Sequence, residues 1–93
     1  MRFHSSLDDV QWNAAARQHT QMRANLHELR RAFPPRTRDA RAALRAYRNA
    51  IQDFGREVLK PRVMIDGDVL NDLSDLVALR FAEYAKARDF RGD

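Results

Sequence analysis

The stretch RDARAALRAYRNAIQDFGREVL, residues 38–59, decides the fold. Its apolar positions recur at alternating spacings of four and three residues, the repeat of a helix packed along a seam; they are Ala40, Leu44, Tyr47, Ile51, Phe54 and Val58. Pro34-Pro35 and Lys60-Pro61 flank the stretch, and proline stops helices because it lacks an N–H donor and restricts the residue before it. We therefore predict a helix over residues 38–59, capped by Thr37.

A similar seam precedes this stretch and predicts a helix over residues 6–33. Ser5 and Ser6 are candidate caps, since each has an aspartate three residues later. Only a few residues separate the two helices, which favours an antiparallel hairpin. Gly55 lies beside the second seam and indicates either a close helix approach or a weak point. The seam of the first helix consists of Trp12, Ala15, His19, Met22, Leu26, Leu29 and Phe33.

A third helix is predicted over residues 68–88, after a turn at Asp66-Gly67-Asp68. Its apolar face is wide enough to serve two neighbours, and comprises Val69, Leu70, Leu73, Leu76, Val77, Phe81 and Tyr84. The chain has 93 residues, the size of one domain, with a modest core. We predict an all-α fold over residues 1–93, an antiparallel hairpin with a third helix, either alone or as a dimer.

Composition and spacing argue against most classes of chemistry. The sequence has no cysteine, which excludes disulfide scaffolds, thiolate zinc sites and cysteine nucleophiles. No pair of histidines has metal-ligand spacing, and Asp66-Gly67-Asp68 does not match the spacing of an EF-hand loop. No nucleophile–base–acid set or glycine-rich phosphate loop is visible. We therefore expect a non-enzymatic protein without cofactor or metal, and with neither a membrane span nor a secretory signal.

Charge is distributed unevenly along the chain. Lysine plus arginine number 17 and aspartate plus glutamate 13, a net charge of +4. Residues 1–62 hold 13 basic and 6 acidic residues, a net of +7, whereas residues 63–93 hold 4 and 7, a net of −3. Basic residues also gather around the hairpin turn, where Arg30, Arg31 and Arg36 occur. The sum of +4 therefore combines a basic hairpin with an acidic third segment.

On helical wheels these charges form two stripes, each within an arc of about 80°. The basic stripe belongs to the second helix and consists of Arg38, Arg41, Arg45, Arg48 and Arg56, with Gln52 among them. We expect Asp39, Asp53 and Glu57 on the far side of that helix. The acidic stripe belongs to the third helix and consists of Asp68, Asp72, Asp75 and Glu83. The basic stripe could bind an acidic protein or a phosphate backbone, meet the acidic stripe, or remain solvated.

Three further residues are candidate interface anchors: Trp12, Arg80 and Tyr84. Arg80 falls within the apolar arc of the third helix, where arginine either extends its head to the edge or reaches an acid on a partner. Trp12 continues the first seam and becomes a partner contact if the first helix extends beyond the second.

The sequence favours a small protein-binding regulator, inhibitor or adaptor, with the basic stripe directed at an acidic protein or at a second copy. A nucleic-acid-binding protein is the alternative, although no helix-turn-helix, zinc-finger, basic-zipper or aromatic RNA-binding motif is present. A structural subunit of a phage or secretion assembly is a third. Fifteen arginines against two lysines indicate a GC-rich bacterial or phage genome, and we expect a cytoplasmic protein.

Overall fold

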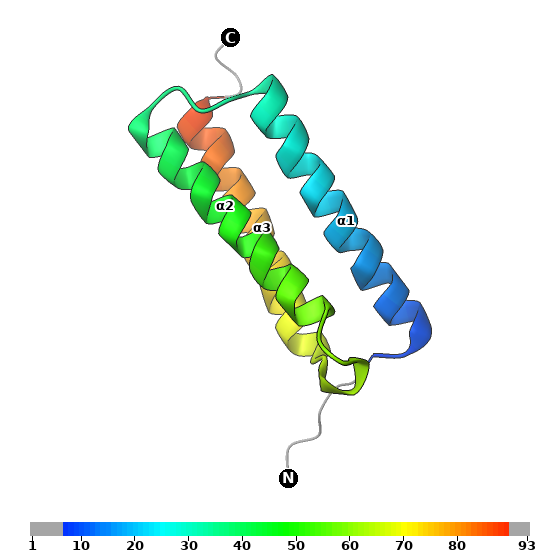
Figure 1. Cartoon of the computed structure of the whole chain (residues 1–93). Helices are drawn as coiled ribbons and strands as arrows, with labels where there is room; N and C mark the ends of the chain where they lie inside the picture. The colour runs from blue at the N-terminus through cyan, green and yellow to red at the C-terminus, as the bar shows by residue number, and fades with distance from the viewer. Residues whose placement is uncertain (1–6, 90–93) are drawn as a thin grey trace.

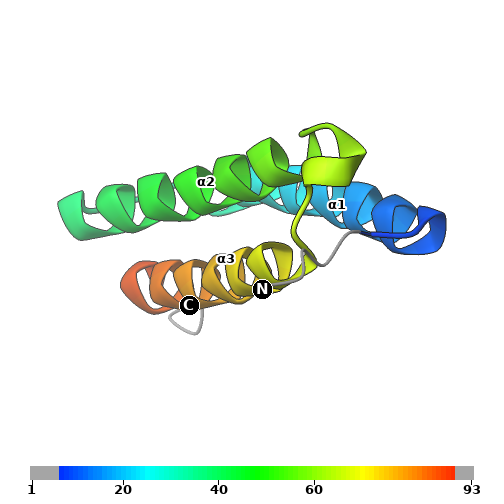
Figure 2. The same cartoon turned by 90° about the horizontal axis from the view of Figure 1, so that it is seen from below.

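The described residues form three α-helices of similar length: α1 (Asp9–Ala32), α2 (Arg38–Val58) and α3 (Gly67–Arg88). A short 3-10 helix, η1 (Arg62–Met64), precedes α3. The structure is a computed structural model that describes residues 7–89. α1 and α2 run antiparallel in one layer, and α3 returns antiparallel to α2 in a second layer (Figures 1 and 2). The predicted all-α, three-helix arrangement is confirmed, and the described residues contain no strand.

Side chains of the preceding residue cap each of the three α-helices. Asp8 accepts a hydrogen bond from the N–H of Gln11 at 2.8 Å, and the Gln11 side chain accepts one from the N–H of Asp8. Thr37 caps α2 as predicted, and Asp66 caps α3. α1 therefore begins at Asp9 rather than near residue 6, because Asp8 supplies the cap; the candidate caps Ser5 and Ser6 lie outside the described residues.

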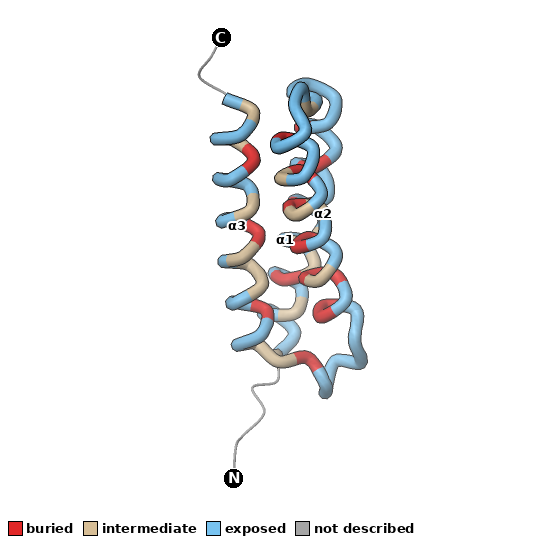
Figure 3. The backbone as a smooth tube through the Cα atoms, turned by 90° about the vertical axis from the view of Figure 1, so that its left-hand side faces the viewer, coloured by how far each residue is buried: buried red, intermediate tan, exposed pale blue. Residues whose placement is uncertain are grey.

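The core follows the seam of α2 closely. All six of its predicted positions are buried, and Ile65, in the loop before α3, is completely buried beside them. The buried positions lie where the α1–α2 layer and α3 face each other (Figure 3). α2 packs more extensively on α3 than on α1, so it is the central helix of the bundle.

The other two faces are buried less completely than predicted. On α1, His19 and Trp12 are half-buried and Phe33 is exposed. On α3, Leu70, Val77 and Tyr84 are buried, whereas Leu73 and Leu76 are half-buried, and Val69 and Phe81 are exposed. The face of α3 serves one neighbour chiefly, α2, which is why its outer positions remain in contact with solvent.

Two polar links fix the ends of the bundle. The Tyr84 hydroxyl donates to the backbone carbonyl of Phe33 at 2.5 Å, which ties α3 to the end of α1. At the opposite end, the buried carboxylate of Glu57 accepts from the N–H of Asp66 at 3.1 Å and pairs with Lys60 at 2.8 Å. Glu57 therefore faces inward and joins α2 to the start of α3.

Candidate functional site

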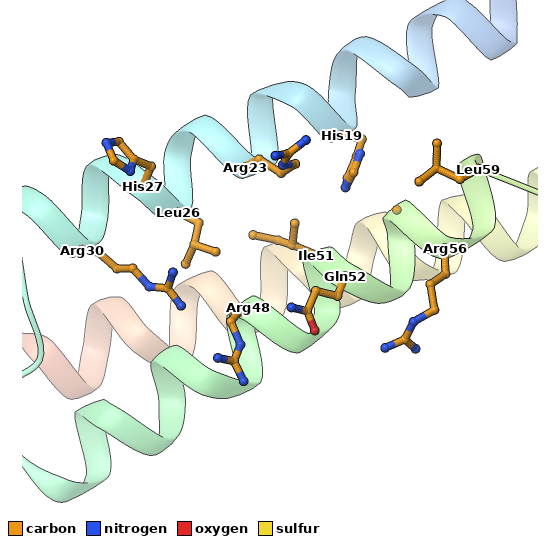
Figure 4. A pocket seen from close by; sticks show the side chains of 11 residues that line it. His19, Arg23, Leu26, His27, Arg30, Arg48, Ile51, Gln52, Arg56 and Leu59 are labelled. Carbon is orange, nitrogen blue, oxygen red and sulfur yellow. The ribbon is translucent and has the colours of Figure 1, made fainter.

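A groove between α1 and α2 forms a concave surface on the described part of the chain. It has a volume of about 510 Å³, within the range of ligand-binding clefts. Residues from α3 do not line it, and α3 lies behind the two helices that do (Figure 4). Its lining residues are His19, Arg23, Leu26, His27, Arg30, Arg48, Ile51, Gln52, Gly55, Arg56 and Leu59.

The groove is strongly basic because arginines line both of its walls. Arg23 and Arg30 come from α1, and Arg48 and Arg56 come from α2, whereas no described acid lines the groove. Within residues 7–89, Arg23, Arg30 and Arg48 form no ion pair. Guanidinium groups without a carboxylate partner are suited to binding a carboxylate or phosphate group from another molecule.

Arg48 is the most constrained of these arginines. Its Nε is buried and has no hydrogen-bond partner among the described residues, and its terminal nitrogen reaches Asn49 only at 3.5 Å. An enclosed charged donor without an acceptor is energetically costly. The terminal nitrogens of Arg48, with only this long bond to Asn49, are the atoms that an acidic group in the groove would bind.

Close packing of α1 on α2 forms the floor of the groove. The His19 ring lies directly over Gly55, where a Cβ would come within 2.7 Å of ring atom Cε1. The ring also lies 6.3 Å from that of Phe54. Burial, and secondly the positive charge of Arg23, lower the pKa of His19 from its usual 6.5. Of the two interpretations of Gly55, the structure therefore supports close helix approach.

Only part of the predicted basic stripe lines the groove. Arg48 and Arg56 line it, whereas Arg38, Arg41 and Arg45 are exposed and do not. Asp53 is not remote from the stripe as predicted, because it is one helical turn from Arg56 and pairs with it at 2.8 Å. The prediction for Asp53 was therefore wrong.

The three basic residues of the predicted turn also separate. Arg30 lines the groove, Arg31 pairs with Glu28 on the exposed side of α1, and Arg36 is exposed in the loop. They do not form one patch, because α1 continues to Ala32 and directs Arg30 and Arg31 to different sides.

The acidic stripe of α3 does not meet the basic stripe within the chain. No ion pair among residues 7–89 joins Asp68, Asp72, Asp75 or Glu83 to an arginine of α2. α3 turns its buried side, Leu70 and Val77, toward α2, which leaves the acids on the outer face. Arg48 and Arg56 of the basic stripe instead line the groove together with Arg23 and Arg30 of α1.

Each of the three candidate anchors is buried or already bonded within the chain. Tyr84 is fully buried and bonded to Phe33, so its assignment as an interface anchor was wrong. Arg80 pairs with Glu83 on its own helix at 2.7 Å. Trp12 is half-buried; its Nε1 donates to the carbonyl of Val58 at 3.4 Å, and the Arg62 guanidinium lies 5.8 Å from its ring centroid.

Sequence reasoning missed the α1 wall of the groove. His19, Arg23, His27 and Arg30 fall within about 80° on a helical wheel, beside the apolar seam of α1. A wheel of the first helix would therefore have revealed this basic flank. Its position opposite Arg48 and Arg56 required the antiparallel register of the two helices.

No three His, Cys, Asp or Glu side chains of residues 7–89 gather in a way that could hold a metal ion. In the same range, each helix is too short or too polar to cross a membrane. No family model, curated protein or solved structure matches the chain.

Proposed function

We propose that this is a non-enzymatic, protein-binding regulator or adaptor that holds an acidic surface of its partner in the groove between α1 and α2. The observation that carries the proposal is the set of arginines without an ion pair on both walls, Arg23 and Arg30 on α1 and Arg48 on α2. Such an arrangement selects a partner through charge complementarity and speeds its association. We place this binding in the cytoplasm, where a chain without cysteine suits the reducing conditions.

The apolar part of the groove favours a protein over a nucleic acid. Leu26 and Ile51 lie at its floor, and Leu59, 76% exposed, lies at one end. Such apolar surface gains stability when an apolar side chain covers it, whereas a phosphate backbone offers none. A concave surface with an apolar floor and basic walls fits an acidic helix with an apolar side.

Nucleic-acid binding remains a second candidate because of three exposed arginines outside the groove. Arg38, Arg41 and Arg45 form no ion pair among the described residues and follow one flank of α2. Residues in such a row can contact successive phosphates along a strand.

Fluorescence anisotropy with two labelled probes tests whether the chain binds an acidic protein surface or a nucleic acid. One probe is an 18-residue helical peptide of leucine and glutamate with one apolar side, and the other is a 20-base-pair DNA duplex. We expect the peptide to bind more tightly at 0.15 M salt. An Arg30→Gln/Arg48→Gln variant should weaken its binding about tenfold, since each charge pair contributes up to about 1 kcal/mol.

Arg17→Gln is the matched control, because Arg17 is exposed on α1 and does not line the groove. Peptide binding that Arg30→Gln/Arg48→Gln leaves unchanged contradicts the proposal. Tight DNA binding with a steep salt dependence, reduced by neutralising Arg38, Arg41 and Arg45, would establish the second candidate in its place.

A further inference from the structure

The outer face of α3 carries the acidic side chains that the groove lacks. Asp68, Asp72 and Asp75 lie on one side of α3 and form no ion pair within residues 7–89. Leu79 falls within the same arc and is 52% exposed, and the half-buried Leu76 lies beside it. α3 therefore presents an acidic face with an exposed leucine, directed away from its own core.

We propose that this acidic face of α3 docks in the α1–α2 groove of a second copy of the chain, so that copies associate head to tail. The inference rests on the proposed function, since it uses the same groove and names one acidic helix that fits it. The acids supply acceptors for the unpaired Arg23, Arg30 and Arg48, and Leu79 covers apolar surface in the groove.

The lengths of the two surfaces agree. The α1 wall extends from His19 to Arg30, which is about 16 Å at 1.5 Å per residue. The acidic face from Asp68 to Leu79 covers the same number of residues and therefore the same length. One α3 helix can thus lie along the full groove as a fourth helix beside α1 and α2.

The positions of the two surfaces determine the kind of assembly. α3 lies behind α1 and α2 in the view into the groove, so the groove opens on the side of the α1–α2 layer away from α3 (Figure 4). The acids of α3 lie opposite its buried residues Leu70 and Val77, and therefore face the other side of the bundle. A contact between two different surfaces on opposite sides of a molecule does not close into a two-fold dimer. Each added copy leaves one free groove and one free acidic face, so the association continues with concentration.

Sedimentation velocity of the full chain over a concentration series tests the inference. In 0.05 M salt the weight-average mass should rise past that of a dimer, and in 0.5 M salt it should return to a monomer, because salt screens exposed charges. The groove variant Arg30→Gln/Arg48→Gln and the acidic-face variant Asp72→Asn/Asp75→Asn should each weaken association about tenfold. Circular dichroism confirms that both retain their helices.

A mixture of the two variants gives the sharpest result. The groove variant keeps its acidic face and the acidic-face variant keeps its groove, so the equimolar mixture has one productive contact and should stop at a one-to-one dimer. Arg17→Gln and Asp39→Asn, exposed charges outside both surfaces, are the matched controls and should associate as the unmodified chain does.

Three outcomes overturn the inference: a monomer at all concentrations in low salt, association that ends at a dimer, and association that neither variant weakens. If the chain stays monomeric while the acidic peptide still binds in the groove, self-association fails and the proposed function stands. If the groove variant changes neither measurement, both fail.

Discussion

The carboxylate of Glu57 accepts a hydrogen bond from the backbone N–H of Asp66, 3.1 Å away, although the two residues belong to different helical segments. Glu57 is only 6% exposed. Glu57→Ala should lower the free energy of unfolding by about 1–3 kcal/mol, because it removes the part-buried hydrogen bond to the Asp66 N–H and opens a gap in the core. Urea denaturation measures the change.

Glu28→Ala is the control for this prediction. Glu28 also forms an i,i+3 ion pair, with Arg31, but both side chains are more than half exposed. Solvent screens such a pair, so we expect an unchanged denaturation midpoint. Equal effects of the two substitutions on the denaturation midpoint would show that burial of Glu57 contributes nothing to stability.

Tyr84→Phe should destabilise the protein by about 1 kcal/mol, the usual net contribution of one hydrogen bond. The lost hydroxyl donates to the Phe33 carbonyl and links the ends of α1 and α3. Tyr47→Phe is a matched control, since Tyr47 is equally a core residue but its hydroxyl makes no hydrogen bond with another described residue. Thermal denaturation of the two variants should separate them, and a Tyr47→Phe effect as large as that of Tyr84→Phe would argue against the link.

The stability of the fold should decrease as pH falls below about 6.5 through the titration of His19. Burial and the charge of Arg23 lower the pKa of His19, so the unfolded chain takes up its proton at a higher pH than the folded chain does. Arg56 on the facing helix lines the same groove and adds positive charge. The stability that neutral His19 contributes to the fold is therefore fully present above pH 6.5 and is lost as pH falls toward the folded-state pKa of His19.

His19→Gln should reduce the fall in melting temperature between pH 7 and pH 5. Arg17→Gln, at an exposed position on α1 outside the groove, should leave that fall unchanged. If both variants follow the unmodified chain, the acid sensitivity arises elsewhere, in the carboxylates.

Gly55→Ala should have two opposing effects on the stability of the protein, and a double-mutant cycle with His19 separates them. Alanine favours the helix by about 1 kcal/mol, but its Cβ would overlap the His19 ring and displace it toward water. The stabilising effect should therefore be larger in a His19→Ala background than in the unmodified chain. In the single variant, nuclear magnetic resonance titration should show the His19 pKa returning toward 6.5; identical effects in both backgrounds would contradict the contact.

The arrangement of helices was predictable because it depends on local signals. The seam of α2, its Thr37 cap and the flanking prolines are each read within a few residues, and all six seam positions are buried. The start of α1 was less certain, since Ser5, Ser6 and Asp8 are all chemically able to cap a helix. Gln11, which completes the capping box with Asp8, decides between them.

The groove was only half predictable, because it depends on which helices become neighbours. The stripe on α2 identified Arg48 and Arg56, but a wheel of one helix cannot show that α1 places Arg23 and Arg30 opposite them. Tyr84 was misjudged for a related reason, because it reaches Phe33, 51 residues away in the sequence. Arg80 pairs with Glu83 on its own helix, and its role as an interface anchor stays a prediction.

α1 is attached to the rest of the bundle most firmly at its two ends. Near its start, Asp9 pairs with Arg62 and Trp12 donates a hydrogen bond to the carbonyl of Val58. Just past its end, the carbonyl of Phe33 accepts a hydrogen bond from the Tyr84 hydroxyl. Between them, Gln18 to Ser74 is the one side-chain hydrogen bond from α1 to α3 among the described residues. In hydrogen–deuterium exchange, the amides in the middle of α1 should therefore exchange before those of α2. One wall of the groove belongs to this less protected segment, so the acidic peptide bound in the groove would slow its exchange and leave that of α3 unchanged.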